Sequence, residues 1–298
     1  MILTIGKKLI KYGKGDSEMY DLSVCLAAIR IKNWERLYNS IVESIGDYKF
    51  ELTFCGPHTE LPDALKDLEN VKCIQDHGPP ARAQQASMQG ASGRYITWAA
   101  DDGWFLPNKL SECIEQLDSM GEEKKALVTQ YVEGGVVALG DAKLGMYCMN
   151  FHEPIRSPFY PNHFLIFNSV ILPTEYFKEL GGFDCVFEGT TMAHADFGAR
   201  AQLDGVKAVL TDIVFECTQF EGTSGDHAPI HYAQLSHDQP LYRRIWNSSS
   251  CLTRIKIDFN NWKKADKIWK RRFSDNPSLV RMNIHNQGTS ISPGREEE

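Results

Sequence analysis

The stretch "GRYITWAADDGWFLPNKL", residues 93–110, joins a buried-strand pattern to a pair of acids. Its first part, residues 94–99, is rich in β-branched and aromatic residues, which predicts a strand inside a sheet. The strand ends at Asp101 and Asp102. Adjacent carboxylates repel each other unless a cation neutralises them. The two acids are therefore either a solvated turn or part of a metal site.

The chain on the N-terminal side of this stretch alternates between strand and helix patterns. We expect strands at 22–29, 50–55, 71–74 and 94–99, with helices at 33–45, 60–69 and 80–91. Buried strands that alternate with helices predict an α/β fold, in which parallel strands carry helices on both faces of the sheet. Ligands of such sheets bind beyond the carboxyl ends of the strands, and the acid pair falls there.

Composition sets broad limits on the class of protein. With 298 residues and 42% hydrophobic side chains, the chain is long enough to bury one large core or two fused smaller ones. No apolar stretch approaches the ~20 residues that span a bilayer, and the first residues do not fit a signal peptide. Eight cysteines without a CxxC pair favour reduced thiols and a cytoplasmic location. A net charge of -7 makes a nucleic-acid partner unlikely on composition.

The chain resembles a family-2 glycosyltransferase of the GT-A fold over about residues 21–250. The resemblance rests on patterns that follow one another in the family's order: a strand and an amphipathic helix, "GPPARAQQASMQGASGRYI" (78–96), the acid pair with "GWFLPNKL" (103–110), "LPTEYFKELGGFD" (172–184) and "DFGAR" (196–200). It implies a Rossmann-like mixed sheet with helices on both faces. It also implies transfer of a sugar from a nucleotide-sugar donor to a glycan acceptor, with a divalent cation and inversion by single displacement.

The resemblance assigns the acid pair to a metal. A departing diphosphate needs its growing charge stabilised, and Mg²⁺ or Mn²⁺ with oxygen ligands does this well. Asp102 is implied as the first metal ligand, and Asp101 as a ligand through water or a partner of the ribose. His227 is the implied third ligand, and the alternative reading of His227 is a solvated or loop-stabilising histidine. Where the family often has a further acid, two residues before the pair, this chain has Ala99.

The nucleotide is expected at the ends of the first two strands. The resemblance places Ala28 and Arg30 after the first strand, and Gly56 and Pro57 after the second, around the nucleobase. This chain has no acid between residues 56 and 59, where uridine-binding members often carry an Asp. UDP is therefore the default nucleotide rather than a deduction.

Arg82 and Gln85 are further expected donor contacts. Two prolines before Arg82 suit the first turn of a helix, whose N-terminus carries partial positive charge. Arg82 would then meet a phosphate or the donor sugar, and Gln85 falls near a position where the family commonly has Asn. The alternative reading of Arg82 is an ordinary surface arginine.

The catalytic base is expected within "AHAD", residues 193–196, where the family commonly has E-D-x-D. An inverting transferase needs a base to take the proton of the acceptor hydroxyl. Either His194 or Asp196 is this base, and Asp196 is favoured. In the alternative reading Asp196 only pairs with Arg200, four residues later on a helix, and His194 is a packed helix residue.

We divide the chain into an N-terminal extension (1–20), a nucleotide-sugar half (21–105), an acceptor and catalytic half (106–252) and a C-terminal segment (253–298). Residues 254–272 hold eight Lys or Arg and two Asp. The spacing of the aromatic residues there predicts one helical face, formed by Phe259, Trp262, Trp269 and Phe273. This helix, within 254–273, either docks on the core, which we favour, or makes peripheral contact with a membrane.

Two other functions stay open. Ala99 and His194 stand where the family has acids, which suits a sugar-nucleotide-binding module without catalysis. The basic C-terminal segment suits a transferase whose acceptor is a nucleic acid. The sequence leaves the oligomeric state open.

Overall fold

The structure is a computed structural model that describes residues 20–133, 155–157, 160–217, 228–246 and 253–270. The strands in chain order are β1 (Leu22–Ala27), β2 (Phe50–Gly56), β3 (Val71–Gln75), β4 (Tyr95–Trp98), β5 (Gly103–Phe105), β6 (Lys125–Glu133), β7 (Ile155–Ser157), β8 (Tyr160–Phe164), β9 (Val170–Pro173) and β10 (Lys207–Cys217). The α-helices are α1 (Trp34–Ile45), α2 (Pro80–Ser87), α3 (Lys109–Ser119), α5 (Thr174–Glu179), α6 (Thr190–Leu203), α7 (Ala228–Ala233) and α8 (Gln239–Trp246).

Most strands form a single mixed sheet of eight, in the order β3-β2-β1-β4-β9-β6-β10-β5. The four strands β3, β2, β1 and β4 run parallel. β9 is antiparallel to β4 and β6, and β5 is antiparallel to β10. The predicted α/β class with a mixed sheet is thus confirmed, and the carboxyl ends of four neighbouring strands share one edge.

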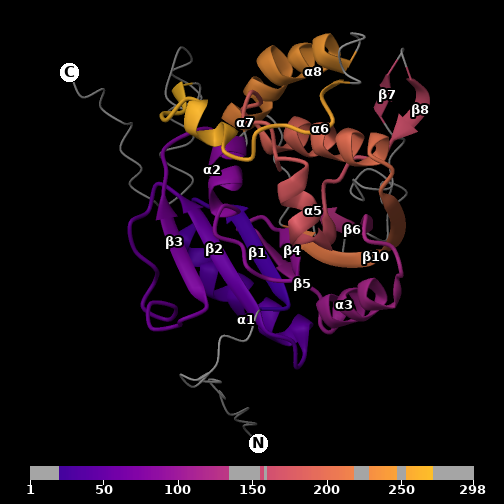
Figure 1. The fold of residues 1–298 in the computed structure, drawn as a ribbon. Helices are drawn as coiled ribbons and strands as arrows, with labels where there is room; N and C mark the ends of the chain where they lie inside the picture. The colour runs from indigo at the N-terminus through magenta and orange to yellow at the C-terminus, as the bar shows by residue number, and fades with distance from the viewer. Residues whose placement is uncertain (1–19, 134–154, 158–159, 218–227, 247–252, 271–298) are drawn as a thin grey trace, which may run out of the picture.

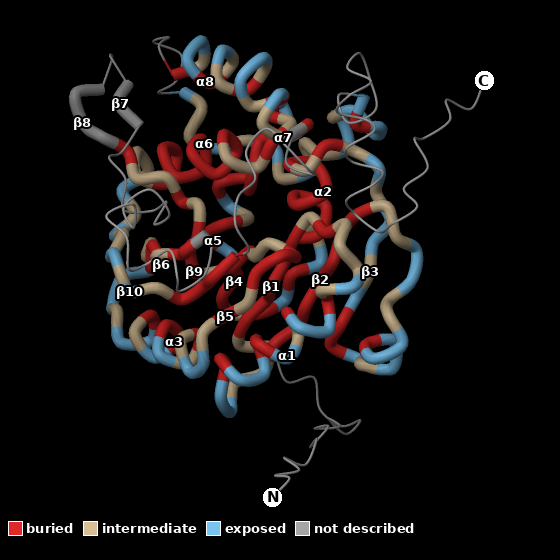
Figure 2. Tube along the Cα trace, turned by 180° about the vertical axis from the view of Figure 1, so that it is seen from behind, coloured by how far each residue is buried: buried red, intermediate tan, exposed pale blue. Residues whose placement is uncertain are grey.

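Helices cover both faces of the sheet. Successive side chains of β1 point alternately to two hydrophobic clusters, one on each face. Leu22, Val24 and Leu26 belong to a cluster that includes α1 and α3 residues. Cys25 points to a second cluster, which includes residues of α2, α5 and α6. In Figure 1, α1 and α3 accordingly lie below the sheet, while α2, α6 and α8 lie above it. Figure 2 shows the buried strands between these layers. Helices on both faces are therefore confirmed.

The expected helix at 60–69 is not present, because the segment forms turns. The carbonyl of Pro62 accepts the N–H groups of Leu65 and Lys66, which closes a single turn. Only Leu65 is deeply buried there. A short helix depends on packing an apolar face, and one buried side chain does not provide such a face.

Residues 254–270, which we call the strap, do not form the predicted amphipathic helix. Within residues 254–269 the helical stretch is a 3-10 turn at Asn261–Lys264, and Lys270 at the end of the strap is α-helical. The side chain of Asp258 accepts the backbone N–H of Asn260 (2.9 Å), and its carbonyl accepts the Nδ2 of Asn261 (2.8 Å). Such local bonds compete with helix formation. The strap instead runs across α2 in an irregular path (Figure 1).

The strap docks on the core of the protein, which is the alternative that the sequence analysis favoured. It does so without forming a helix. Phe259 meets Phe177 edge to face, Trp262 covers the guanidinium of Arg82, and Trp269 is 4% exposed. The predicted aromatic stripe is therefore wrong, since these rings contact different parts of the core. Phe273 lies outside the described residues.

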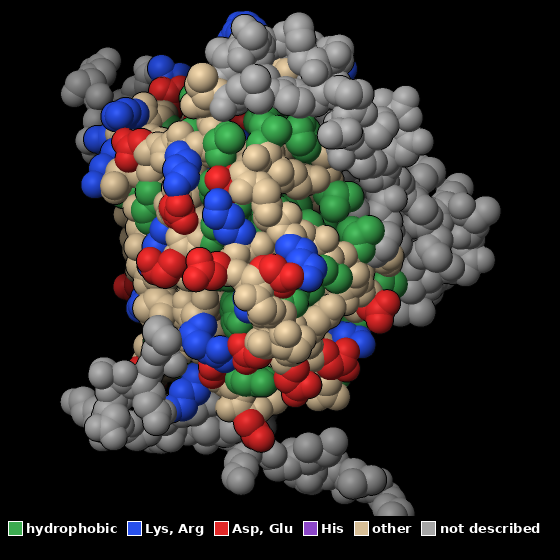
Figure 3. Space-filling view, turned by 45° about the vertical axis from the view of Figure 1, so that its right-hand side comes forward, with side chains coloured by type: hydrophobic (Ala, Val, Ile, Leu, Met, Phe, Trp, Pro, Cys, Tyr) green, Lys and Arg blue, Asp and Glu red, His purple; other side chains and the backbone are tan. Residues whose placement is uncertain are grey.

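On the face shown in Figure 3, basic and acidic side chains are interspersed. Among the described residues, no helix combines the length and apolar character needed to cross a membrane.

Candidate functional site

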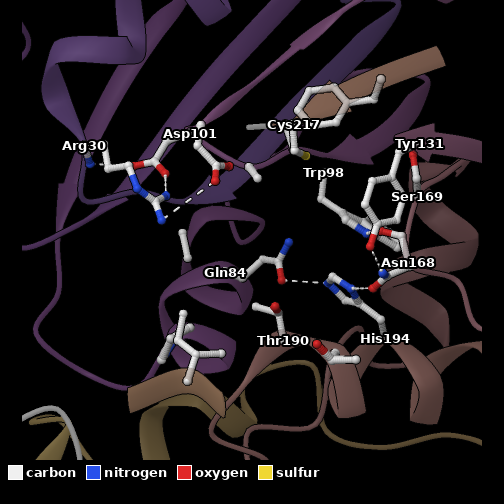
Figure 4. Close-up of a pocket in the computed structure, with 18 of the residues that line it drawn as sticks. Arg30, Gln84, Trp98, Asp101, Tyr131, Asn168, Ser169, Thr190, His194 and Cys217 are labelled. Carbon is white, nitrogen blue, oxygen red and sulfur yellow. Dashed lines mark hydrogen bonds and ion pairs between the residues drawn. The ribbon is translucent and has the colours of Figure 1, made fainter. Parts of the chain in front are cut away.

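A cavity in two parts opens beyond the carboxyl ends of the parallel strands. The large chamber, of about 230 Å³, lies beside the 101–102 turn and is walled by residues of α2, α6 and α7 (Figure 4). The small chamber, of about 90 Å³, lies over the ends of β1, β2 and β3. Arg30 and Asp101 line both chambers. The cavity is thus where sequence reasoning expected a ligand.

Arg30 supplies the cation that the acid pair needs. Asp101 accepts the backbone N–H groups of Ile29 and Arg30 on one oxygen, at 2.6 and 2.5 Å. Its other oxygen pairs with the guanidinium of Arg30. The same guanidinium lies 3.8 Å from the carboxylate of Asp102. Asp101 therefore ties the loop after β1 to the turn after β4, while Asp102 lines the large chamber.

The two acids that were predicted as metal ligands therefore have different contacts. Both oxygens of Asp101 accept hydrogen bonds from Ile29 or Arg30, so Asp101 holds Arg30 in place. Asp102 is the carboxylate that could contribute to a cation site. No group of three or more His, Cys, Asp or Glu among the described residues could hold an ion. His227 lies outside those residues.

The carboxylate of Asp102 nonetheless fits an ion such as Mg²⁺ whose other ligands come from water and from a substrate. Mg²⁺ commonly takes one or two carboxylates, several waters and the phosphate oxygens of a nucleotide. A single carboxylate that lines the large chamber matches that pattern.

The small chamber is built from closely packed backbone. Ala28, Gly56 and Pro57 line it, as the resemblance implied. A Cβ on Gly56 would lie 1.9 Å from the carbonyl oxygen of Ala28, so only glycine allows the ends of β1 and β2 to approach this closely. Two further walls come from Gly78, after β3, and from Trp269 of the strap.

Arg82 and Gln85 do not line either chamber, contrary to the prediction. Arg82 pairs with Asp76 at 2.9 Å and donates to the carbonyls of Trp262 and Ala265. Gln85 donates to the carbonyl of Phe259 at 2.9 Å. Both side chains hold the strap. The reading of Arg82 as an ordinary surface residue is also wrong, since Arg82 is 4% exposed.

His194 lies in the wall of the large chamber and is 5% exposed. Its Nδ1 is 2.9 Å from the Oδ1 of Asn168, and its Nε2 is 2.9 Å from the Oε1 of Gln84 (Figure 4). Asn168 in turn donates to the hydroxyl of Tyr131 at 2.7 Å. Burial lowers the pKa of His194 to about 3, so the imidazole is neutral at pH 7.

A neutral imidazole has one donor and one acceptor, so it cannot donate to two carbonyl oxygens. One of the two amides therefore turns its N–H₂ to His194: either Gln84, or Asn168 with the hydroxyl of Tyr131 donating to the Asn168 oxygen. His194 positions Gln84 and is poorly suited to act as a base.

Asp196, the favoured base, lies outside the cavity and is fully buried. Its Oδ2 accepts the Nε of Arg200 at 2.8 Å. Its Oδ1 accepts the Nε1 of Trp246 and a guanidinium N–H of Arg254, both at 3.2 Å. The Asp196–Arg200 pair of the alternative reading is present. The carboxylate joins α6, α8 and the strap.

Sequence reasoning missed several residues of the large chamber: Gln84, Trp98, Tyr131, Asn168, Ser169, Thr190, Thr191 and His231. Gln84 and Pro80 both line it, and their spacing of four puts them on one face of α2. That helical spacing was a usable signal. Tyr131 and Asn168 come from β6 and from the segment before β9, and no local pattern marks them.

No family model matches the sequence, and no curated protein matches it. Solved structures do match, among them "S. aureus TarS 1-349 in complex with UDP-GlcNAc", with 15% identity and a TM-score of 0.49 over 81% of this chain and 72% of that chain.

S. aureus TarS 1-349 without a named ligand matches with 13% identity and a TM-score of 0.49, over 66% of this chain and 60% of that chain. "GalNAc-T7 with UDP, GalNAc and Mn2+" matches with 12% identity and a TM-score of 0.49, over 84% of this chain and 57% of that chain. The chain thus covers less than two thirds of some of these relatives. At such scores the likeness carries no argument for function, which has to come from the site.

Proposed function

We propose that the protein is a glycosyltransferase that transfers a sugar from a nucleotide-sugar donor to a hydroxyl group of a glycan. The observation that carries the proposal is the Arg30–Asp101 pair at the junction of the two chambers. A nucleotide-sugar has a nucleoside at one end, a diphosphate in the middle and a sugar at the other. The small chamber, the guanidinium of Arg30 and the large chamber follow the same order.

In the proposal, the small chamber holds the nucleoside, and Arg30 donates to the diphosphate. A planar guanidinium binds phosphate oxygens in a bidentate way, and Asp101 holds it in place before the ligand arrives. The sugar and the acceptor occupy the large chamber. There Gln84, Thr190 and Thr191 supply acceptors and donors for sugar hydroxyls.

Asp102 would hold a divalent cation together with the diphosphate. Such a cation would stabilise the negative charge on the leaving diphosphate. We further propose His231 of α7, which lines the large chamber and is partly exposed, as the group that takes the acceptor's proton. Membership of family 2, inversion and the choice of UDP stay part of the proposal.

A melting experiment tests the proposal. Because a ligand that binds only the native state stabilises it, UDP with MgCl₂ or MnCl₂ should raise the melting temperature. The variant Asp102→Ala should lose the metal-dependent part of that rise and keep the part produced by UDP alone. If UDP and metal leave the wild-type melting temperature unchanged, the proposal fails.

A binding module without catalysis is the second candidate. One observation favours it: neither His194 nor Asp196, the two predicted bases, is placed to accept a proton from a ligand. Nucleotide release from UDP-sugars in the presence of Mn²⁺ separates the candidates. A binding module would hold the donor without releasing UDP.

A further inference from the structure

The small chamber has one aromatic wall, and the strap supplies it. Trp269 lines the chamber opposite the ends of the parallel strands, although all the strands precede it in the chain. We propose that Trp269 is the surface on which the base of a nucleoside diphosphate stacks, and that the strap serves to deliver it. This inference rests on the proposed function and adds a binding residue from outside the sheet.

The backbone of Trp269 is fixed to the sheet edge. Its N–H donates to the carbonyl of His77 at 2.9 Å, and Ile268 forms a parallel bridge with His77. His77 follows β3 closely. The end of the strap is therefore bridged to the segment after β3, which lines the small chamber.

The middle of the strap is fixed to α2. Arg82 donates to the carbonyls of Trp262 and Ala265, and Gln85 donates to that of Phe259. Arg82 is itself held by Asp76, which lines the small chamber. Each contact uses a strap carbonyl, so it fixes the path of the backbone whatever the strap side chains are. Arg82 and Gln85 are positioning residues for Trp269.

The shape and chemistry of the small chamber suit a flat ring. Small residues form part of its other walls, among them Ala28, Gly56, Gly78 and Ala83, and the side chains of Arg30, Asp76, His77 and Asp101 also line it. These leave a narrow space of about 90 Å³ facing an indole. Bases stack on aromatic side chains whatever their identity, because every base has a π-face. Trp269 would therefore add affinity for a nucleobase and none for a bare diphosphate.

The experiment measures binding of two probes, UDP and inorganic pyrophosphate, by calorimetry in the presence of MgCl₂. Trp269→Ala should weaken UDP binding by about tenfold, the lower part of the range for losing one stacked base, and leave pyrophosphate binding unchanged. Trp269→Phe keeps a ring and should stay within about threefold of wild type. Ile268→Ala is the control, because it removes an apolar side chain of the strap that is 37% exposed and lines neither chamber.

The outcomes are distinct. Unchanged UDP affinity in Trp269→Ala, or an equal loss for UDP and pyrophosphate, overturns the stacking role and leaves the proposed function standing. Wild-type protein that binds neither probe overturns both. Should Trp269→Ala fail to fold, Trp269→Phe decides by fluorescence: UDP should quench the wild-type indole signal more than that of the variant. Equal quenching in the two proteins overturns the inference.

Discussion

The guanidinium of Arg30 shows how a single side chain resolves the electrostatics of two adjacent acids. The sequence predicted that Arg30 and the 101–102 turn follow strands, because each comes after a buried run. It did not predict their contact, because that depends on β1 lying directly beside β4 in the sheet. The ends of neighbouring parallel strands were predictable. The strand order that makes them neighbours was not.

His194 should make the stability of the protein depend on pH. Its pKa is about 3 in the folded state, against about 6.5 for an unperturbed imidazole. The unfolded chain therefore binds a proton between these values that the folded protein does not. Stability is complete above pH 6.5 and falls toward pH 3, by up to ~1.4 kcal/mol per pH unit from this group.

The variant His194→Gln removes this contribution. Urea unfolding at pH 7 and pH 4.5 should show a smaller loss of stability on acidification than in wild type. The groups around the ring are Gln84, Asn168 and the aromatic rings of Trp98 and Phe183, none of which titrates in this range. Equal losses in the two proteins would show that His194 titrates normally.

Asp196 and His231 should respond to substitution in opposite ways. Asp196→Asn leaves the buried Arg200 without its counter-charge and should reduce the free energy of unfolding by roughly 3–5 kcal/mol. His231→Gln should leave stability nearly unchanged and lower turnover by about 10²–10⁴ with donor binding retained. Denaturant unfolding and steady-state kinetics make the comparison. A stable, slow Asp196→Asn variant would return the base to Asp196.

At the scale of single elements, the helical spacing of α2 shows which of its residues share a face. It does not show which face meets the cavity. Its start at Pro80 was predicted from the two prolines. Arg82 and Gln85 share one helical face, and Gln84 lies on another, so the spacing separates a strap contact from a cavity residue. The sequence gives no sign of which face meets the cavity, because the strap that covers the first face lies far along the chain.

The strap shows a second limit. Aromatic spacing predicted a helix, but the hydrogen bonds of Asp258 to the next turn favour an irregular path. Asp and Asn at 258, 260 and 261 were a readable signal against the helix. The carbonyl contacts with Arg82 and Gln85 were not readable from the sequence, since they involve the strap backbone alone.

Gly56→Ala tests the approach of β1 and β2. The added Cβ would collide with the carbonyl of Ala28, so the two strand ends must separate. We expect a loss of about 1–3 kcal/mol in stability and a marked loss of UDP binding. Gly90→Ala is the matched control, since nothing lies within 4 Å of its Cβ. Chemical denaturation and calorimetry measure both variants, and normal UDP binding by Gly56→Ala would contradict the assignment of the small chamber.

At the scale of the whole molecule, two hydrophobic cores lie on opposite faces of one sheet, and the strap closes the upper one. Ile255 and Phe259 pack on the cluster formed by α5 and α6 residues. Long-range contacts of this kind explain why Tyr131, Asn168 and Trp269 were not predicted as cavity residues. Tyr131 and Asn168 line the cavity because of the order of the strands in the sheet. Trp269 lines it because of the path of the strap.

Ending the chain after Thr253 tests this arrangement. Asp184 and Asp196 would lose Arg254, and Arg82 and Gln85 would lose strap carbonyls. We expect the free energy of unfolding to fall by about 3–5 kcal/mol, with a matching loss of UDP affinity. A chain that ends after Lys270 keeps the strap and serves as the control. A truncated protein that melts and binds UDP as the control does would show that the strap is dispensable.

The position of Trp269 also sets an order in time. A ribosome makes the chain from its N-terminus, and domains begin to fold as they emerge. All the strands of the sheet are synthesised before the strap. All the residues that line the large chamber, including Arg30 and both acids, are therefore synthesised before the aromatic wall of the small chamber. Tight nucleotide binding would then report that translation has passed residue 269.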